Sequence, residues 1–170
     1  MVRLEHVLDS WKAVREDTAA AVEEFPAGEF GFRPTSDVMT FGEVAHHILN
    51  SGHALSGMLL SGEERFNAPD FRAKLAQHLP NVPADATPAQ LAAALRDSVE
   101  RRAAELAARP AQFYAQIVTR MDGVNCTRLE MLQALKEHEL THRAQLFFCM
   151  RMKGMVPATT RRRMAKQAGK

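Results

Sequence analysis

Two histidines lie four residues apart in the segment His138-Glu139-Leu140-Thr141-His142, which has the pattern H-E-x-x-H. On a helix this spacing places both imidazoles on adjacent turns of one face, where they can reach a single divalent ion. The same pattern opens the zinc-protease motif, in which the glutamate is the general base. The position of the third ligand therefore decides which kind of metal site the sequence encodes.

Neither of the two common protease arrangements of the third ligand fits this chain. The extended motif needs glycine and histidine three and six residues after His142, but Gln145 and Phe148 stand there. The other arrangement takes a glutamate from a later helix, yet residues 143–170 contain no Asp, Glu or His. Any further protein ligand must therefore lie upstream of the motif.

Four long helices must position these histidines, and their limits are predicted by apolar periodicity and by capping residues. The first spans residues 4–25 and ends before Pro26. The other three each open at a threonine that is followed by Glu or Gln three residues later, which is the capping-box pattern. They run from Thr40 to near Gly62, from Thr87 to about Arg109, and from Thr127 to Lys153, before the helix-ending Gly154.

The connection between the second and third helices is long, at about 25 residues from Ser61 to Ala86. Within it, Phe71, Leu75 and Leu79 predict a short helix. A connection of this length permits a crossover instead of a hairpin. The chain lacks an internal repeat and a series of strands, so the pattern favours an all-α fold, a four-helix bundle.

The connection between the third and fourth helices has a different character. Residues 113–118 are locally strand-like, and Asp122-Gly123 is a turn signal. We expect an extended excursion there and not a sheet.

The third ligand has to come from one of the five upstream histidines. At 100° per residue, His47 borders the buried stripe of the second helix, whereas His46 points about 100° away. His53 shares the side of His46, which we expect to face solvent or another subunit. His6 lies on the polar side of the first helix, and His78 lies in the long connection.

We therefore predict a metal site formed by His47, His138 and His142. Three neutral imidazoles leave at least one coordination position open for water or substrate, as in catalytic sites and unlike closed structural ones. Such an ion can activate water or hold a thiolate as the nucleophile. Imidazole suits nickel, zinc, iron and copper alike, so the ligands alone do not identify the metal.

Two neighbouring residues, Glu139 and Gln145, are candidates for a supporting role at this site. Glu139 lies beside the ligand stripe and could orient a ligand or a water, or could be a solvated or salt-bridged helix carboxylate. Gln145 lies one turn beyond His142 and could donate a hydrogen bond to a bound water, or could pack in the core. Cys149, on the same face, is expected to be an inert buried thiol. Trp11 and Arg15 could line a pocket for an anionic substrate, although packing of Trp11 is the simpler expectation.

Composition and charge fit a soluble globular protein. Of the 170 residues, 46% are hydrophobic and 25% are charged, and the longest apolar run is too short to cross a membrane. The two cysteines and the charged N-terminal segment make the cytoplasm the default location.

Residues 158–170 carry five basic and no acidic side chains and form a basic tail after the domain of residues 1–157. Such a tail could contact nucleic acid, but a solvated terminus is the more common outcome, so we expect neither nucleic acid nor membrane as a partner.

At two segments the chain resembles the DinB/YfiT-like family of metalloenzymes. One is Thr40-Phe41-Gly42-Glu43-Val44-Ala45-His46-His47-Ile48, with a histidine seven residues after the helix-opening threonine. The other is the H-E-x-x-H segment continued by Arg143-Ala144-Gln145-Leu146 and then by Arg151-Met152-Lys153-Gly154-Met155-Val156-Pro157. The resemblance covers the whole chain.

The resemblance implies a bundle of up-down-down-up topology, with the long second connection as the crossover, and a site made by His47, His138 and His142. It also implies a divalent cofactor, nickel or zinc above all, and a homodimer. The functions it implies are those of a transferase or isomerase that uses a low-molecular-weight thiol with a small-molecule substrate. A hydrolase-like centre that activates water is the other function expected from the open metal site. A non-catalytic metal or small-ligand binding module, such as a stress-response protein, remains the alternative.

Overall fold

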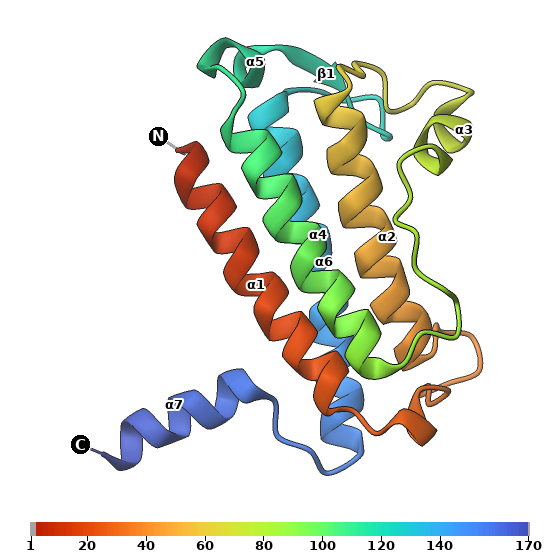
Figure 1. The fold of residues 1–170 in the computed structure, drawn as a ribbon, viewed down its shortest axis with the longest axis vertical. Coiled ribbons are helices and arrows are strands. Elements are labelled where there is room, and N and C mark those ends of the chain that lie inside the picture. Colours follow the sequence, from red (N-terminus) through yellow and green to blue (C-terminus); the bar gives the residue numbers. More distant parts are fainter. Residues whose placement is uncertain (1–2, 170) are drawn as a thin grey trace.

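The computed structural model describes residues 3–169 as a bundle of four long helices with short elements at its ends (Figure 1). The long helices are α1 (Leu4–Glu24), α2 (Phe41–Leu60), α4 (Pro88–Ala107) and α6 (Arg128–Met152). Both α1 and α2 pack against α4 and against α6. Since α1 and α6 run in one direction and α2 and α4 in the other, the topology is up-down-down-up, which confirms the expected fold class.

The predicted starts of α2, α4 and α6 are confirmed by their caps. Each is a capping box in which a threonine hydroxyl accepts from the backbone N–H three residues on, and that residue's side chain accepts from the threonine N–H. At α2, for example, the Thr40 N–H lies 2.7 Å from Glu43 Oε2. Gly154 follows α6 with φ of +73°, a left-handed conformation that favours glycine. The local sequence therefore determines where these three helices begin.

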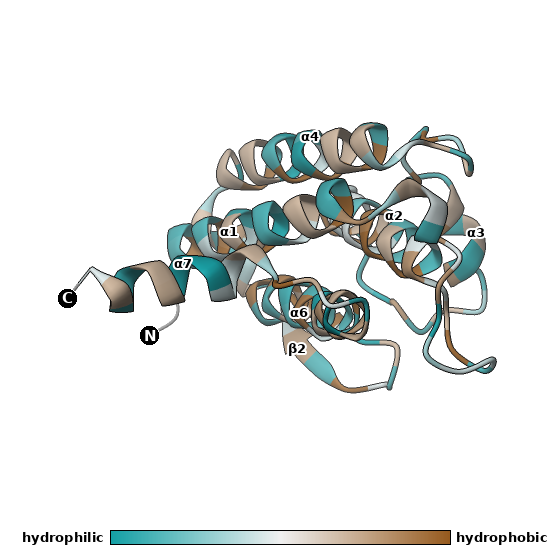
Figure 2. Ribbon diagram, turned by 90° about the horizontal axis from the view of Figure 1, so that it is seen from below, coloured by the Kyte–Doolittle hydropathy of each residue, from teal (hydrophilic) through white to brown (hydrophobic). Residues whose placement is uncertain are grey.

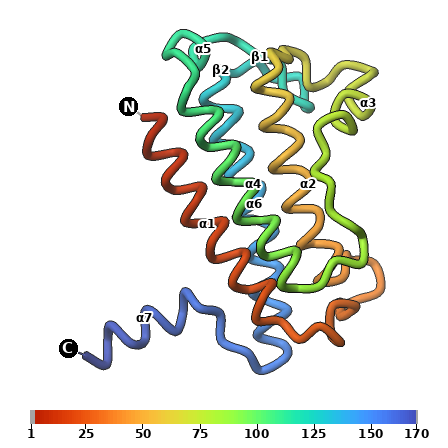
Figure 3. Tube along the Cα trace, in the orientation of Figure 1, coloured from red at the N-terminus to blue at the C-terminus, as the bar shows by residue number. Residues whose placement is uncertain are grey.

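The connection between α2 and α4 contains α3 (Phe71–Ala76). It then runs back along the bundle beside α2, in the direction opposite to that helix (Figure 3). This return lets α4 begin at the same end as α2, so the two helices are parallel neighbours. The predicted short helix is thus present, although Leu79 lies beyond its end and is exposed. The connection is a crossover.

The expectation of no sheet between α4 and α6 was wrong. The strands β1 (Ile117–Thr119) and β2 (Asn125–Thr127) form an antiparallel hairpin in which Val118 pairs with Cys126. The reason is tertiary, because β1 also pairs with the crossover: the Thr119 N–H donates to Glu64 O at 2.7 Å, and the Phe66 N–H donates to Thr119 O at 2.8 Å. Residues 113–115, the first half of the segment that looked strand-like, belong instead to the helix α5 (Ala111–Ala115).

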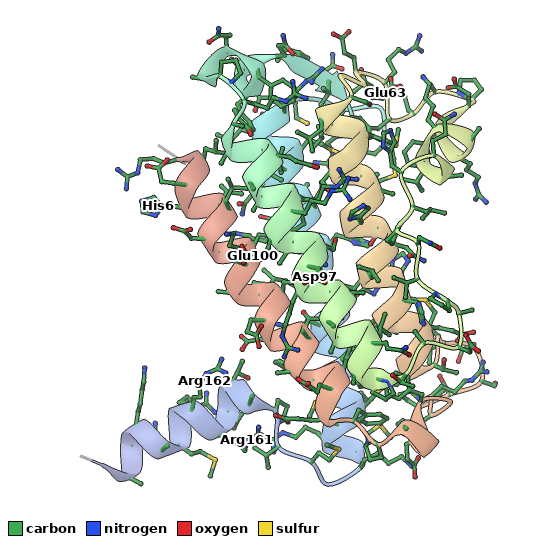
Figure 4. The ribbon with its side chains drawn as sticks, in the orientation of Figure 1. His6, Glu63, Asp97, Glu100, Arg161 and Arg162 are labelled. Carbon is green, nitrogen blue, oxygen red and sulfur yellow. The ribbon has the colours of Figure 1, made fainter. Side chains whose placement is uncertain are left out.

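The C-terminal segment is also more ordered than a solvated, frayed tail. It forms α7 (Ala158–Ala168), which extends away from the four long helices (Figure 2). Arg161 is paired with Glu24 at 2.6 Å, and Arg162 is paired with Asp17 (Figure 4).

A 3-10 turn, η1 (Ala27–Glu29), follows α1. Over residues 3–169, no helix is long and apolar enough to cross a membrane.

The core consists of two apolar clusters, one near each end of the bundle. One contains Leu8, Leu55 and Leu135, and the other contains Val22, Ile48 and Leu146. Between them, buried polar side chains reach inward from α1 and α6, among them Arg15 and Glu139. The histidines of the predicted site belong to this middle level of the bundle.

Candidate metal centre

Three imidazoles from two helices converge on one point. His47 Nε2 lies 3.2 Å from His138 Nε2, and His142 Nε2 lies 3.1 Å from His138 Nε2. The three rings are 4.5 to 5.0 Å apart between centroids and are steeply inclined to one another. The structure thus brings together all three histidines that the sequence predicts for the site.

The packing of α2 against α6 sets this geometry. On α2, the neighbours of His47 at Ile48 and Leu49 are fully buried and hold the helix in the core. On α6, Leu135 and Leu146 anchor the stripe that carries His138 and His142, one helical turn apart. All three rings are half-buried, so their inner edges meet between the helices while one side stays open.

Burial keeps two of the rings neutral. Desolvation, and then the nearby His142 and His47, lower the pKa of His138 to about 4. Desolvation followed by the nearby His142 also lowers the pKa of His47 from its ordinary value. A histidine must be neutral to bind a metal ion, so both rings are ready to be ligands at neutral pH.

Gln145 contacts one ring of the cluster, and its side chain is exposed and does not pack in the core. Its Oε1 lies 2.8 Å from His142 Nδ1, which donates the hydrogen bond. This contact fixes the ring hydrogen on Nδ1 and leaves the Nε2 lone pair pointing toward the other two histidines. Partners of this kind orient metal-binding histidines in many proteins.

The donor set fits a divalent ion. His142 Nε2 offers only a lone pair, and His138 Nε2 contacts two ring nitrogens although it carries at most one hydrogen. Ligand nitrogens about 2.05 Å from a tetrahedral ion would be about 3.3 Å apart, close to the spacings seen here. Over the described residues, these histidines are the one group of three or more His, Cys, Asp or Glu side chains that could hold a metal ion.

The structure places Glu139 in the core, where other side chains engage its carboxylate, unlike the general base of a zinc protease. Its carboxylate accepts hydrogen bonds from Arg15 Nε at 2.7 Å, from Trp11 Nε1 at 2.8 Å and from Thr18 Oγ1 at 3.1 Å. The structure thus shows Glu139 as a buried, salt-bridged carboxylate. Trp11 and Arg15 are themselves fully buried, so the idea that they line a substrate pocket was wrong.

The sequence contains a signal that Arg15 is buried, although that signal does not identify Glu139 as its partner. Arg15 lies on the apolar stripe of α1, where a charged side chain needs a buried partner. In α2, a side chain at Gly52 would place its Cβ 2.5 Å from Arg15 Nη2. An interior glycine facing an arginine on an apolar stripe is the signal that sequence reasoning missed.

The other histidines lie outside the cluster. His46 lines a hollow of about 830 Å³ between α2 and residues 82–88. His53 was expected on a solvent or subunit side, but α4 covers it, and its Nδ1 lies 2.9 Å from Ser98 Oγ. His6 projects from the exposed side of α1 (Figure 4), and His78 lies in the crossover near Arg102.

The fold is shared with several solved structures. YfiT from Bacillus subtilis, described as a probable metal-dependent hydrolase with an unusual four-helix bundle topology, aligns with a TM-score of 0.69 at 19% identity, over 90% of this chain and 89% of its own. The DinB-like protein YjoA, also from Bacillus subtilis, aligns with a TM-score of 0.68 at 20% identity, over 89% and 93%. At these identities the likeness shows the fold alone.

A larger protein shares the bundle as well. The mycothiol-dependent maleylpyruvate isomerase aligns with a TM-score of 0.62 at 16% identity, over 85% of this chain. This chain spans only 61% of the isomerase. No curated protein matches the sequence.

A match to the whole sequence agrees with the fold and with the histidine cluster. The sequence model of the DinB family matches residues 1–168, which include every helix described above and all three histidines. The chain therefore belongs to the DinB family.

Proposed function

We propose that this protein is a divalent-metal-dependent enzyme that acts on a small molecule, with His47, His138 and His142 as the metal ligands. The observation that carries the proposal is the convergence of three Nε2 atoms, one of them oriented by Gln145. When bound at such a site, a divalent ion lowers the pKa of a coordinated water or thiol into the physiological range. Nickel and zinc are our first choices of metal, with iron and copper after them.

Of the two reactions expected from the sequence, transfer of a low-molecular-weight thiol is the better supported. The glutamate that acts as general base in a zinc protease is engaged here by Arg15, Trp11 and Thr18. Hydrolysis of that kind would need another base, whereas a thiol bound to a divalent ion is already deprotonated. The mycothiol dependence of a protein with the same fold agrees with this choice.

Metal-dependent hydrolysis is the second candidate, because a site with three protein ligands leaves room for water. The description of YfiT points the same way.

We also propose a cytoplasmic homodimer. Both cysteines are free, as in a reducing compartment, and the exposed Val38, Phe148 and Met152 offer an apolar surface to a second copy.

The test is a comparison of two assays on metal-loaded protein. One assay offers a small thiol with an activated electrophile, and the other offers activated esters without thiol. The proposal predicts a metal-dependent rate in the first assay that is lost on His138→Ala and kept on His46→Ala. A rate in the ester assay alone would favour the hydrolase. No metal-dependent rate in either assay would favour the non-catalytic binding module.

A further inference from the structure

We infer that an apolar cavity next to the histidines binds the uncharged hydrocarbon body of the substrate; this inference rests on the proposed function. The cavity has a volume of about 430 Å³, and His47 and His138 are part of its lining. A molecule bound through one donor atom to an ion between these rings can extend its body into this space, which two of the three histidines line, whereas the hollow beside residues 82–88 has only His47 of the three in its lining. The cavity therefore assigns a substrate class, an aliphatic or aromatic small molecule with a metal-binding head group.

The walls of the cavity are apolar and come from two sources. Leu55 of α2 and Leu135 of α6, which line the cavity, belong to the bundle core. Phe71 and Leu75, four residues apart on one face of α3, also line it. Both side chains are only partly buried, so part of their apolar surface is available to a ligand.

Two segments outside the four long helices complete and stiffen the cavity. The crossover carries α3, and the hairpin turn contributes Met121; both lie at the same end of the bundle (Figure 1). The Phe66 N–H donates to Thr119 O, which ties the crossover to the hairpin. The Lys74 ammonium, 2.6 Å from Glu63, holds α3 against the crossover. A cavity formed in advance loses less conformational entropy when a ligand binds.

The polar groups of the lining are already paired. The Ser51 hydroxyl donates to His47 O at 2.6 Å, and Arg120 is paired with Asp122 at 3.0 Å. The Arg120–Asp122 pair is exposed at the mouth, so a charged ligand body placed among Leu55, Leu135, Phe71 and Leu75 would lose its hydration without gaining a charged partner. The part of the substrate that enters the cavity is therefore uncharged.

A second apolar hollow provides the comparison. It has a volume of about 650 Å³ and lies between α6 and residues 34–39, with Phe148 and Cys149 in its lining. None of the three histidines lines this hollow. If the ligand body occupied this hollow, its binding affinity would change with substitutions at Phe148 and would not change with substitutions in α3.

The experiment uses straight-chain hydroxamic acids, whose head group chelates divalent ions. Binding of acetohydroxamate and octanohydroxamate to the nickel-loaded or zinc-loaded protein is measured by calorimetry. Each buried methylene strengthens binding about fourfold when fully transferred from water. Because some of the chain stays near the mouth, we expect octanohydroxamate to bind at least ~30-fold tighter than acetohydroxamate.

Two matched variants locate the chain of the ligand. Leu75→Asp should reduce the octano-to-aceto affinity ratio to below about threefold, whereas Phe148→Asp should leave the ratio intact. Leu75→Trp, which fills the cavity without adding charge, should lower the ratio as well and guards against loss of folding in the first variant. A ratio that depends on Phe148 and not on Leu75 would overturn the assignment.

The outcomes separate this inference from the proposed function. Acetohydroxamate binding that survives His138→Ala would refute the metal site itself. Metal-dependent binding of acetohydroxamate without any gain from the longer chain would refute only the cavity assignment.

Discussion

The Glu139 carboxylate is bound by the Arg15 guanidinium through two parallel contacts, 2.7 Å from Nε to Oε1 and 2.8 Å from Nη2 to Oε2. Both side chains are buried, and Trp11 and Thr18 occupy the remaining acceptor positions of the carboxylate. The pair joins α1 to the helix segment that lies between His138 and His142. In this protein the glutamate of the H-E-x-x-H motif therefore stabilises the bundle.

Replacing Glu139 with alanine should destabilise the fold strongly. The change leaves the Arg15 charge buried without its partner, and removing one member of a buried ion pair costs about 3–5 kcal/mol. Urea unfolding of the metal-free protein measures the effect. Combining Glu139→Leu with Arg15→Met should recover most of the loss, because the second charge is removed as well. An unchanged unfolding midpoint for Glu139→Ala, with activity abolished, would instead indicate a general base.

Gln145→Leu should weaken metal binding and leave the fold intact. The side chain is exposed, and its Oε1 fixes the hydrogen of His142 on Nδ1. Loss of such a partner typically lowers metal affinity about 10- to 100-fold. Competition with a chromophoric chelator measures the affinity, and thermal unfolding of the metal-free variant is the control. Equal affinities for the variant and the original protein would show that Gln145 does not support the ligand.

The starts of three of the four long helices can be predicted from the local sequence. The capping boxes at Thr40, Thr87 and Thr127 predict the starts of three helices because each depends on side chains only three residues apart. The hairpin could not be predicted in this way. Its strand β1 is three residues long and gains its second partner from Glu64 and Phe66, which are far away in the sequence.

The candidate site could be predicted in part for the same reason. His138 and His142 follow from spacing on one helix, and His47 was preferred over His46 from the direction of the apolar stripe. The pairing of Glu139 with Arg15 joins residues 124 positions apart, so no local pattern contains it. The burial of His53 likewise depends on how α4 packs over α2, and the sequence of α2 alone does not determine this packing.

His53 should make the metal-free protein less stable in mild acid. Burial, followed by the charges of Arg102 and Arg101, lowers its pKa to about 4, against about 6.5 in an unfolded chain. Between these values the unfolded chain binds the proton and the folded protein does not, so stability falls as the pH decreases from 6.5 to 4 and is unaffected above 6.5. The contribution over this window is about 3 kcal/mol.

The check on His53 is the pH dependence of urea unfolding for the metal-free protein and for His53→Gln. The other titrating groups, including His138, are common to both proteins, so the difference between the two curves reports His53. As the pH falls from 6.5 to 4, the original protein should lose about 3 kcal/mol more stability than His53→Gln. Parallel curves over this range would show that folding does not change the pKa of His53.

Removal of α7 should have little effect on nucleic-acid affinity. Two of its arginines, Arg161 and Arg162, are already paired with Glu24 and Asp17 of α1. Surface pairs of this kind contribute about 0–1 kcal/mol to stability each, so a chain ending at Pro157 should also keep its unfolding midpoint. Fluorescence anisotropy with a DNA duplex at two salt concentrations tests the first expectation. Salt-sensitive binding that disappears with α7 would contradict it.

Elemental analysis of protein purified without a metal-affinity tag tests most directly whether the three histidines hold an ion. We predict about one divalent ion per chain, with nickel or zinc as the main element. His47→Ala, His138→Ala and His142→Ala should each deplete it, while His46→Ala, one residue away on the same helix, should retain it. Protein that carries no stoichiometric metal, or that loses its metal on His46→Ala and keeps it on His47→Ala, would contradict the site described here.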